Sequence, residues 1–279
     1  MFNKSILFLL ATFLLLTTSC GYASMHTSRW TKVIPDVQDQ VAMIKVEVYN
    51  EKPTCLSLFR ECDLKIPAGW RVAAIGTGFV VSSNGKIVTN FHVVYPQITK
   101  EHTRILVQFR NDDRQHLVYK TYSHPEYDMV ILQIKAKNLH PVKIEKRHPP
   151  KLGEEIVSAG WNYGDSLMFS PGIVGLLKIS PDSSTIKYKW YQTTVQIYPG
   201  FSGGPVFNRK GHLVGINNAH FTGRPGFGLI IPARYLLKVL EEEATPDTKE
   251  SLEQLSKIQT CIEKEEKNEQ RTTSESRTK

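Results

Sequence analysis

Short apolar runs separated by turn residues fill the middle of this chain of 279 residues. Between residues 41 and 235 the runs are rich in β-branched and aromatic residues, with glycine, proline and asparagine between them; examples are 41–48, 104–109 and 185–191. Few of the runs show the 3.6-residue spacing of a helix. Many short strands joined by turns are typical of a barrel or sandwich, so we expect an all-β fold. One helix is predicted at 232–243.

The first 23 residues predict a secretory signal peptide. Lys4 supplies a positive charge, and the apolar run 6–16 is too short to span a bilayer as a permanent helix. Two cleavage positions fit: before Cys20, which would then carry a lipid, and after Ala23, which follows the small-x-small rule. We expect an exported protein of the periplasm or cell envelope, either anchored to the membrane as a lipoprotein through Cys20 or released in soluble, secreted form.

Export implies an oxidising compartment, so the remaining cysteines are informative. Cys55 and Cys62 lie close together in the sequence, and a disulfide between them would stabilise the fold by about 2–3 kcal/mol. Two unpaired thiols are the alternative. Cys261 lacks a partner of this kind. No second cysteine or histidine pair stands at ligand spacing, so no metal site is expected.

Charge is distributed unevenly along the chain. Residues 241–279 hold eleven acidic and seven basic residues and so have a net charge of −4. Because the whole chain has a net charge of +8, residues 1–240 carry a net charge of +12. The basic residues are scattered through strands and loops without a clustered motif, which argues against nucleic-acid binding. The charged tail 241–279 is expected to be part helical, with one short amphipathic stripe, and part disordered.

A serine between glycines, Ser202, is the first candidate for chemistry. It lies in the run 198–205, where glycines can adopt positive φ and let successive N–H groups point at one place. Such a place can hold the oxyanion of a tetrahedral intermediate. The same run is also compatible with an ordinary glycine-rich hairpin.

His92 and Asp128 supply the partners that such a serine needs. An Asn84-Gly85 hairpin signal joins two strands, and His92 follows the second of them. Asp128 precedes the buried run 129–134, a costly place for a carboxylate without hydrogen bonds. Each residue alone has an ordinary structural explanation. Together they predict a nucleophile, a base and an orienting carboxylate in the chain order of chymotrypsin-like enzymes.

With these motifs the chain resembles the HtrA/Deg branch of the trypsin-like serine proteases, over about residues 41–240. The matching segments are 76–81, 89–93, 124–128, 170–174, 200–205 and 211–217. The resemblance implies two six-stranded antiparallel β-barrels of chymotrypsin-like type with a C-terminal helix. His92 would be the general base, Asp128 the orienting acid and Ser202 the nucleophile, with the N–H groups of Gly200 and Ser202 as the oxyanion hole. No cofactor and no metal are implied.

The resemblance also divides the chain. After a linker at 24–40, the protease domain would span 41–240, with barrels at about 41–142 and 152–232 joined by the basic, proline-rich segment 143–151. The length leaves no room for the PDZ domain that many members of this branch carry. Members are often trimers, so a homo-oligomer is implied.

Specificity is predicted from the residues around the nucleophile. By the same resemblance, Gln196, six positions before Ser202, would lie at the base of the substrate pocket and bring no carboxylate, with Ile197 and Ala219 as opposite apolar walls. The pocket should prefer small or aliphatic residues at P1. Phe201 departs from the small polar residue usual in the family, and we expect it to narrow the leaving-group side or act as a gate. Segments 198–201 and 219–226 are expected to switch shape on substrate binding.

The predicted function is that of a serine endopeptidase acting on exported or envelope proteins, with unfolded proteins or peptides as substrates. Two alternatives stay open. One is a non-catalytic, chaperone-like or binding protein on a protease scaffold. The other is a serine esterase.

Overall fold

The computed structural model describes residues 30–51, 54–56, 64–66, 68–98, 102–179, 187–220 and 226–243. The segment 1–23 predicted as a signal peptide, with Cys20, lies outside the described residues, as do Cys62, Cys261, residues 221–225 and the tail beyond residue 243. Within the described ranges no helix is long and apolar enough to cross a membrane.

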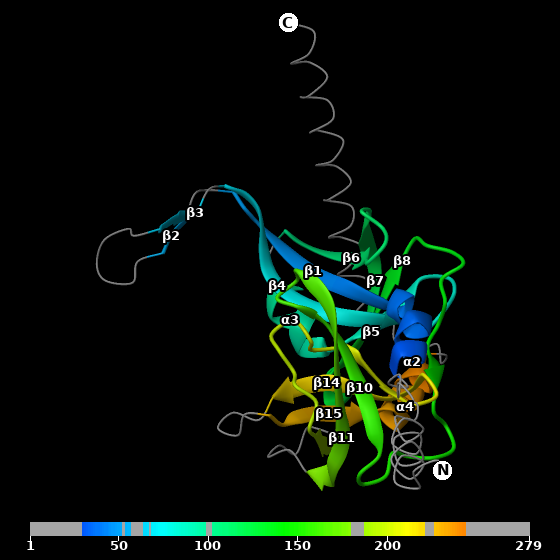
Figure 1. The fold of residues 1–279 in the computed structure, drawn as a ribbon. Helices are drawn as coiled ribbons and strands as arrows, with labels where there is room; N and C mark the ends of the chain where they lie inside the picture. The colour runs from blue at the N-terminus through cyan, green and yellow to red at the C-terminus, as the bar shows by residue number, and fades with distance from the viewer. Residues whose placement is uncertain are drawn as a thin grey trace, which may run out of the picture.

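Six strands close the first barrel (Figure 1). Alternate residues of a strand, such as Ala42, Ile44 and Val46, are apolar and lie in one buried cluster, as the two-residue period of a strand requires. In barrel order they are β1 (Val41–Asn50), β4 (Gly69–Val80), β5 (Lys86–Thr89), β8 (Met129–Ile134), β7 (Gln115–His124) and β6 (Thr103–Phe109). β1 and β4 form a long hairpin that extends beyond the barrel, and its far end carries the short pair β2 (Thr54–Leu56) and β3 (Leu64–Ile66).

The second barrel is also closed, because β13 pairs with β14 in addition to β10. In barrel order its strands are β13 (Pro205–Asn208), β10 (Glu155–Asn162), β11 (Ser166–Ile179), β12 (Trp190–Thr193), β15 (Gly228–Pro232) and β14 (His212–His220). The expected two antiparallel six-stranded barrels are thus confirmed. The segment between them is more ordered than a linker: β9 (Lys143–Ile144) adds to β14 as a parallel strand.

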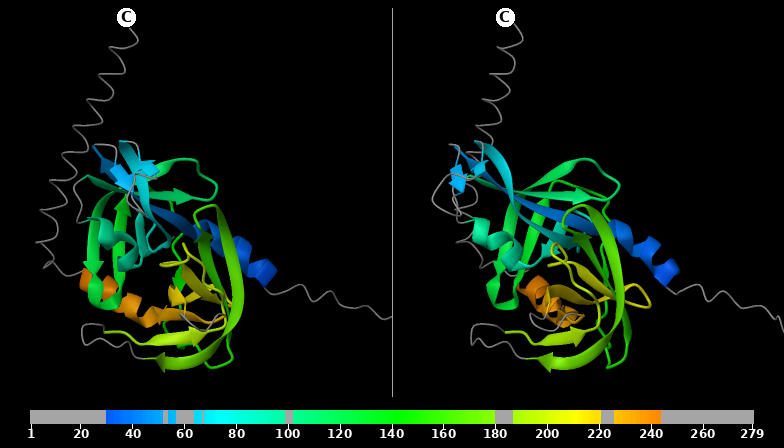
Figure 2. Two further views of the ribbon diagram at one scale, coloured as in Figure 1. Left: turned by 90° about the vertical axis from the view of Figure 1, so that its left-hand side faces the viewer. Right: turned by 60° about the vertical axis from the view of Figure 1, so that its left-hand side comes forward.

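A shared apolar core lies between the barrels. Phe79 of the first barrel and Phe207 and Leu213 of the second are fully buried in one cluster. Burial of each such side chain contributes about 1.5–3 kcal/mol. The C-terminal helix α4 (Ala233–Glu243), confirmed where the sequence predicts it, packs across this junction (Figure 2). Its Tyr235 ring lies 5.9 Å from the ring of Tyr127 in the first barrel.

Residues 30–40 differ from the linker expected there. They form α2 (Trp30–Val37) and the 3-10 turn η1 (Gln38–Gln40), and α2 leads directly into β1. Val33 and Val37, one helical turn apart, are buried in the core between the barrels. The short length and Pro35 within the helix hide this element from sequence patterns.

Two local predictions also need correction. The Asn84-Gly85 turn is a four-residue loop rather than a two-residue one, because Val81 N–H donates to Lys86 O and Gly85 N–H to Ser82 O. His92 does not stand at the end of a strand: after Asn90 the chain forms the helix α3 (Phe91–Ile98), and His92 lies in its first turn. Asp128 follows the 3-10 turn η2 (Pro125–Tyr127) and precedes β8.

Candidate active site

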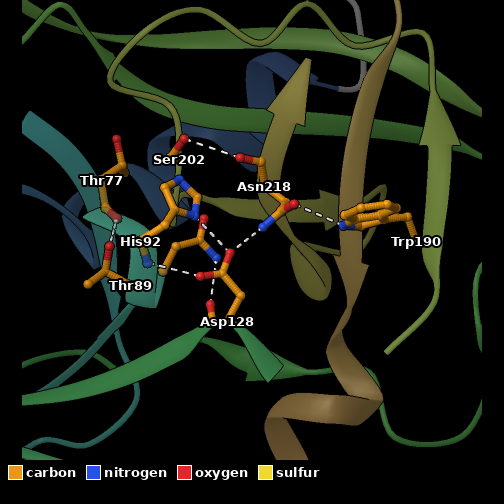
Figure 3. Close-up of polar contacts among 8 residues, drawn as sticks. Thr77, Thr89, His92, Asp128, Trp190, Ser202 and Asn218 are labelled. Atoms are coloured by element: carbon orange, nitrogen blue, oxygen red, sulfur yellow. Dashed lines mark hydrogen bonds and ion pairs between the residues drawn. The ribbon is translucent and has the colours of Figure 1, made fainter. Parts of the chain in front are cut away.

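The three candidate residues come from different elements and meet between the barrels. His92 lies on α3 and Asp128 follows η2, both in the first barrel, whereas Ser202 lies on the loop before β13 of the second (Figure 3). The structure therefore brings together residues that are up to 110 positions apart in the sequence.

Asp128 holds His92 through two hydrogen bonds. The backbone N–H of His92 donates to Asp128 Oδ1 at 2.9 Å, and His92 Nδ1 lies 2.8 Å from Asp128 Oδ2. A carboxylate only accepts, so Nδ1 carries the hydrogen and Nε2 is left as an acceptor. Asp128 itself has left-handed backbone angles, φ 50° and ψ 46°, which aspartate tolerates better than most residues. The local strain turns its carboxylate toward the helix that carries His92.

Asn218 is a site residue that the sequence did not point to. Its side-chain N–H donates to Asp128 Oδ2 at 2.5 Å, and its side-chain oxygen accepts from Trp190 Nε1 at 2.9 Å (Figure 3). Because an indole N–H can only donate, this bond fixes which end of the amide faces Asp128. No sequence signal would have identified the pair, since Trp190 and Asn218 are 28 positions apart on β12 and β14.

Tyr188 lies beside the same carboxylate. Burial, and after it the negative charge of Asp128, raise the pKa of Tyr188 well above its usual value. The phenol therefore stays neutral next to Asp128 throughout the physiological range. It leaves the single negative charge of the site on the carboxylate that faces His92.

Ser202 is held next to His92 but is bonded elsewhere. Its Oγ donates to the backbone oxygen of Asn218 at 3.2 Å, whereas the described hydrogen bonds of His92 go to Asp128 (Figure 3). A change of the Ser202 χ1 angle would release Oγ toward Nε2. Such bonds often form only when substrate is bound, so the geometry is compatible with a serine–histidine pair.

The loop before β13 presents two free N–H groups. Gly200 has φ +96°, a backbone conformation that favours glycine. Among the described residues, the N–H groups of Gly200 and Ser202 donate to no protein acceptor, whereas those of Phe201, Gly203 and Gly204 are all bonded. Two unpaired N–H groups on either side of one residue, beside a serine hydroxyl, have the composition of an oxyanion hole.

Phe201 does not face the cleft, so the expected narrowing or gate is wrong. The side chain is 0% exposed and is among the largest fully buried ones. Its ring lies against the backbone of β10, where a Cβ on Gly160 would come within 2.4 Å of it. The ring of Tyr198 meets it edge-on at 5.7 Å. Phe201 therefore anchors the loop from below, and Gly160 provides the space for it.

Phe201→Ala is expected to lower the free energy of unfolding by about 3–5 kcal/mol, because it opens a cavity in a fully packed site. Urea unfolding followed by fluorescence measures this. Gly160→Ala alone should also destabilise, since its methyl group meets the Phe201 ring. In the double variant the methyl group enters the space that the ring has left, so the double loss should be smaller than the sum. An additive double variant would show that the two sites are not in contact.

The three predicted specificity residues differ in exposure. Gln196 is exposed, and its side-chain oxygen accepts a hydrogen bond from the Tyr198 hydroxyl. Ile197 is half-buried and packs against the backbone of Gly228, where a Cβ would lie 2.7 Å from it. Ala219 is half-buried on β14, one residue after Asn218. None of the three carries a charge.

The described residues also include a group of possible metal ligands. His124, Glu126 and Glu242 place ligand atoms within 4.8 Å of one another. Ion pairs account for this cluster as it stands: His124 Nδ1 is 3.4 Å from Glu242 Oε2, and Lys187 Nζ is 3.9 Å from Glu126 Oε1. Acyl transfer by a serine, a histidine and an aspartate does not require a metal at this cluster.

Known proteins with similar sequences are trypsin-like peptidases. Residues 76–216 match the family described as trypsin-like peptidase domain. A probable periplasmic serine endoprotease DegP-like of Ectopseudomonas mendocina is 35% identical over 174 residues, covering 61% of this chain and 35% of the relative. One from Pseudomonas putida strain F1 is 36% identical over 156 residues, covering 55% and 31%. The chain thus spans about a third of the length of these relatives.

Two solved protease structures superpose on this chain. The serine endoprotease from Yersinia pestis superposes with a TM-score of 0.59 at 25% identity, covering 78% of this chain and 67% of that one. The HtrA-type protease AlgW with decapeptide gives 0.62 at 25% identity, covering 76% and 66%.

Proposed function

Because this chain belongs to the family of trypsin-like peptidase domains, as its HtrA-like motifs indicate, we propose that it is a serine endopeptidase with Ser202 as its nucleophile. The observation that carries the proposal is the bonding of His92. Asp128 binds the Nδ1 side of the imidazole, which leaves Nε2 to act as a base toward Ser202. The two free N–H groups of Gly200 and Ser202 support it independently.

The chemistry follows from these positions. Ser202 Oγ attacks the peptide carbonyl carbon while His92 Nε2 takes the hydroxyl proton, and the N–H groups of Gly200 and Ser202 bind the oxyanion that forms. His92 then gives the proton to the leaving amine, and an acyl-enzyme remains on Ser202. A water molecule, deprotonated by the same imidazole, attacks the ester and releases the acid. Asp128, held in turn by Asn218, keeps the imidazole oriented and stabilises its cation.

The three predicted pocket residues carry no charge, which supports small or aliphatic P1 residues. Ile197 and Ala219 offer apolar surface, and Gln196 offers no charge to a lysine or arginine side chain. Selectivity among aliphatic residues should be about 1–3 kcal/mol per methylene group. Cleavage of a randomised peptide library, read by mass spectrometry, should show valine, alanine, isoleucine or leucine at P1.

The site of action is proposed from the relatives together with the signal segment. The curated relatives are named periplasmic endoproteases, and residues 1–23 predict export. We propose protein substrates in the periplasm or envelope. Lipid anchoring through Cys20, a Cys55–Cys62 disulfide and a homo-trimer belong to the same proposal.

Labelling with a fluorophosphonate probe tests the proposal against its two rivals. An activated serine should be labelled stoichiometrically, with the mass increase located on the peptide that contains Ser202. The same preparation should cleave unfolded casein. A folded protein that takes no label and cleaves nothing would be a binding protein, and one that turns over only a simple ester would be an esterase.

A further inference from the structure

Thr77 contacts the loop of the proposed nucleophile from the opposite barrel. We infer that Thr77 is a positioning residue, which fixes the direction of the Gly200 N–H and so keeps the oxyanion hole assembled before substrate arrives. The inference rests on the proposed function, because an oxyanion hole has a role only where an acyl group is transferred. Its evidence is the bonding of the two peptide units on either side of Gly200.

The direction of the Gly200 N–H is not fixed by its own residue. Glycine is free to adopt φ of either sign, so the Pro199–Gly200 peptide could turn over. In the turned form the carbonyl of Pro199, instead of the N–H of Gly200, would face the serine. An oxyanion would then meet an acceptor where it needs a donor. The structure must therefore hold this peptide by contacts from outside the loop.

Both flanking carbonyls are held. The oxygen of Pro199 accepts from the backbone N–H of Tyr163 at 2.9 Å. In a trans peptide the C=O and N–H point in opposite directions, so this bond turns the Gly200 N–H away from β10. The oxygen of Gly200 accepts from the hydroxyl of Thr77 at 2.6 Å. With both ends fixed, the N–H of Gly200 cannot turn over without breaking a hydrogen bond.

The environment of Thr77 leaves its hydroxyl only one direction in which to donate. Thr77 is 0% exposed, and its hydroxyl oxygen accepts a hydrogen bond from the backbone N–H of Trp161 at 2.8 Å. The single hydroxyl hydrogen is therefore directed to Gly200. The backbone N–H of Thr77 donates to the backbone carbonyl oxygen of Ser202 at 2.9 Å, so Thr77 holds the loop at two points.

Close packing around Gly200 and Gly203 leaves no space for a side chain on either residue. A Cβ on Gly203 would lie 2.3 Å from the oxygen of Thr77, and one on Gly200 would lie 2.1 Å from the oxygen of Trp161. Thr89 completes the arrangement by donating to the oxygen of Thr77 at 2.6 Å (Figure 3). The segment 198–201 is thus held in the donor-presenting form without a ligand, and its switching on substrate binding stays a prediction.

The test compares Thr77→Val, which keeps the shape and loses the hydroxyl, with Thr77→Ser, which keeps the hydroxyl. Thr77→Val should lose about 10- to 100-fold in kcat with little change in KM, a fraction of the effect of deleting an oxyanion donor outright. A peptidyl trifluoromethyl ketone, which forms a tetrahedral oxyanion on serine, should bind more weakly by the same factor. Thr77→Ser should stay within about threefold of wild type on both measurements.

Thr193→Val is the matched control. Thr193 is equally buried, and its hydroxyl also donates to a glycine oxygen, that of Gly228, at 3.1 Å. It should lower stability without lowering kcat or weakening the ketone. If Thr77→Val does not fold, Thr77→Cys, a weaker donor of similar volume, should give an intermediate inhibition constant.

Three results would overturn the role of Thr77: wild-type kcat and ketone binding in Thr77→Val or Thr77→Cys, equal loss in Thr77→Ser, or equal loss in Thr193→Val. A wild-type protein that neither cleaves peptides nor binds the ketone would instead remove the proposed function, and this inference with it. An active wild type with an unaffected Thr77→Val removes the inference alone.

Discussion

Ser202→Ala is expected to abolish cleavage of unfolded casein, with kcat lower on the order of 10⁶-fold. The proposed mechanism has no second nucleophile, so nothing replaces the lost Oγ atom. The fold should survive, because that atom makes a single hydrogen bond, to the backbone oxygen of Asn218. Loss of such a bond changes the free energy of unfolding by about 1 kcal/mol.

The experiment measures casein fragments over time with wild type and Ser202→Ala purified in parallel. Thermal unfolding of both proteins serves as the control for the fold. Cleavage by the variant at more than a trace of the wild-type rate would mean that Ser202 is not the nucleophile. Fragment ends from the wild type would at the same time report the P1 residues.

Asp128→Asn is expected to lower kcat on the order of 10⁴-fold, the size seen when the same change is made in a serine–histidine–aspartate triad. The carboxylate accepts from three donors: His92 N, His92 Nδ1 and Asn218 Nδ2. An asparagine has one acceptor oxygen and would turn its NH₂ group toward one of these donors. If this NH₂ group faces Nδ1, then Nδ1 must accept, and the imidazole hydrogen moves to Nε2. Nε2 could then no longer take the Ser202 proton.

Asp112→Asn is the matched control for this variant. Asp112 also lies next to a histidine, with His116 Nε2 at 3.2 Å, and it pairs with Arg114. These bonds hold the pKa of Asp112 well below its usual value, the Arg114 side-chain bond most strongly. Asp112 and Arg114 lie in the turn between β6 and β7 and make none of the hydrogen bonds described for the active site, so kcat should not change. Equal losses in Asp112→Asn and Asp128→Asn would mean that charge removal in general, rather than the bond to His92, lowers the rate.

The sequence predicts best the features that depend on residues adjacent in the chain. Alternating apolar runs and turn residues predicted the strands, because burial of one sheet face imposes that pattern. It was least informative for short helices. The segment 91–98 contains two valines and an isoleucine, which favour strands, and becomes helical only through its contacts with β1, β4 and β8.

The residues of the candidate site also differ in how well the sequence predicts them. His92, Asp128 and Ser202 were predictable as a set, since each stands in a recognisable local run. Thr77 and Asn218 were not, because they act on residues 123 and 90 positions away. The Tyr163 contribution is a backbone N–H and has no side-chain signature at all. Phe201 was placed wrongly because the tight turn around Gly200 directs its side chain into the protein.

The order of the two barrels along the chain has a consequence for biosynthesis. The first barrel ends at residue 134, and the loop that carries Ser202 follows some 65 residues later. Domains tend to form from the N-terminus as the chain is made. A growing chain can thus hold His92 against Asp128 while it still lacks both the serine and Asn218. Unfinished copies would have no working site, so the cell would face the proposed proteolytic activity only from chains that have been made at least through β14.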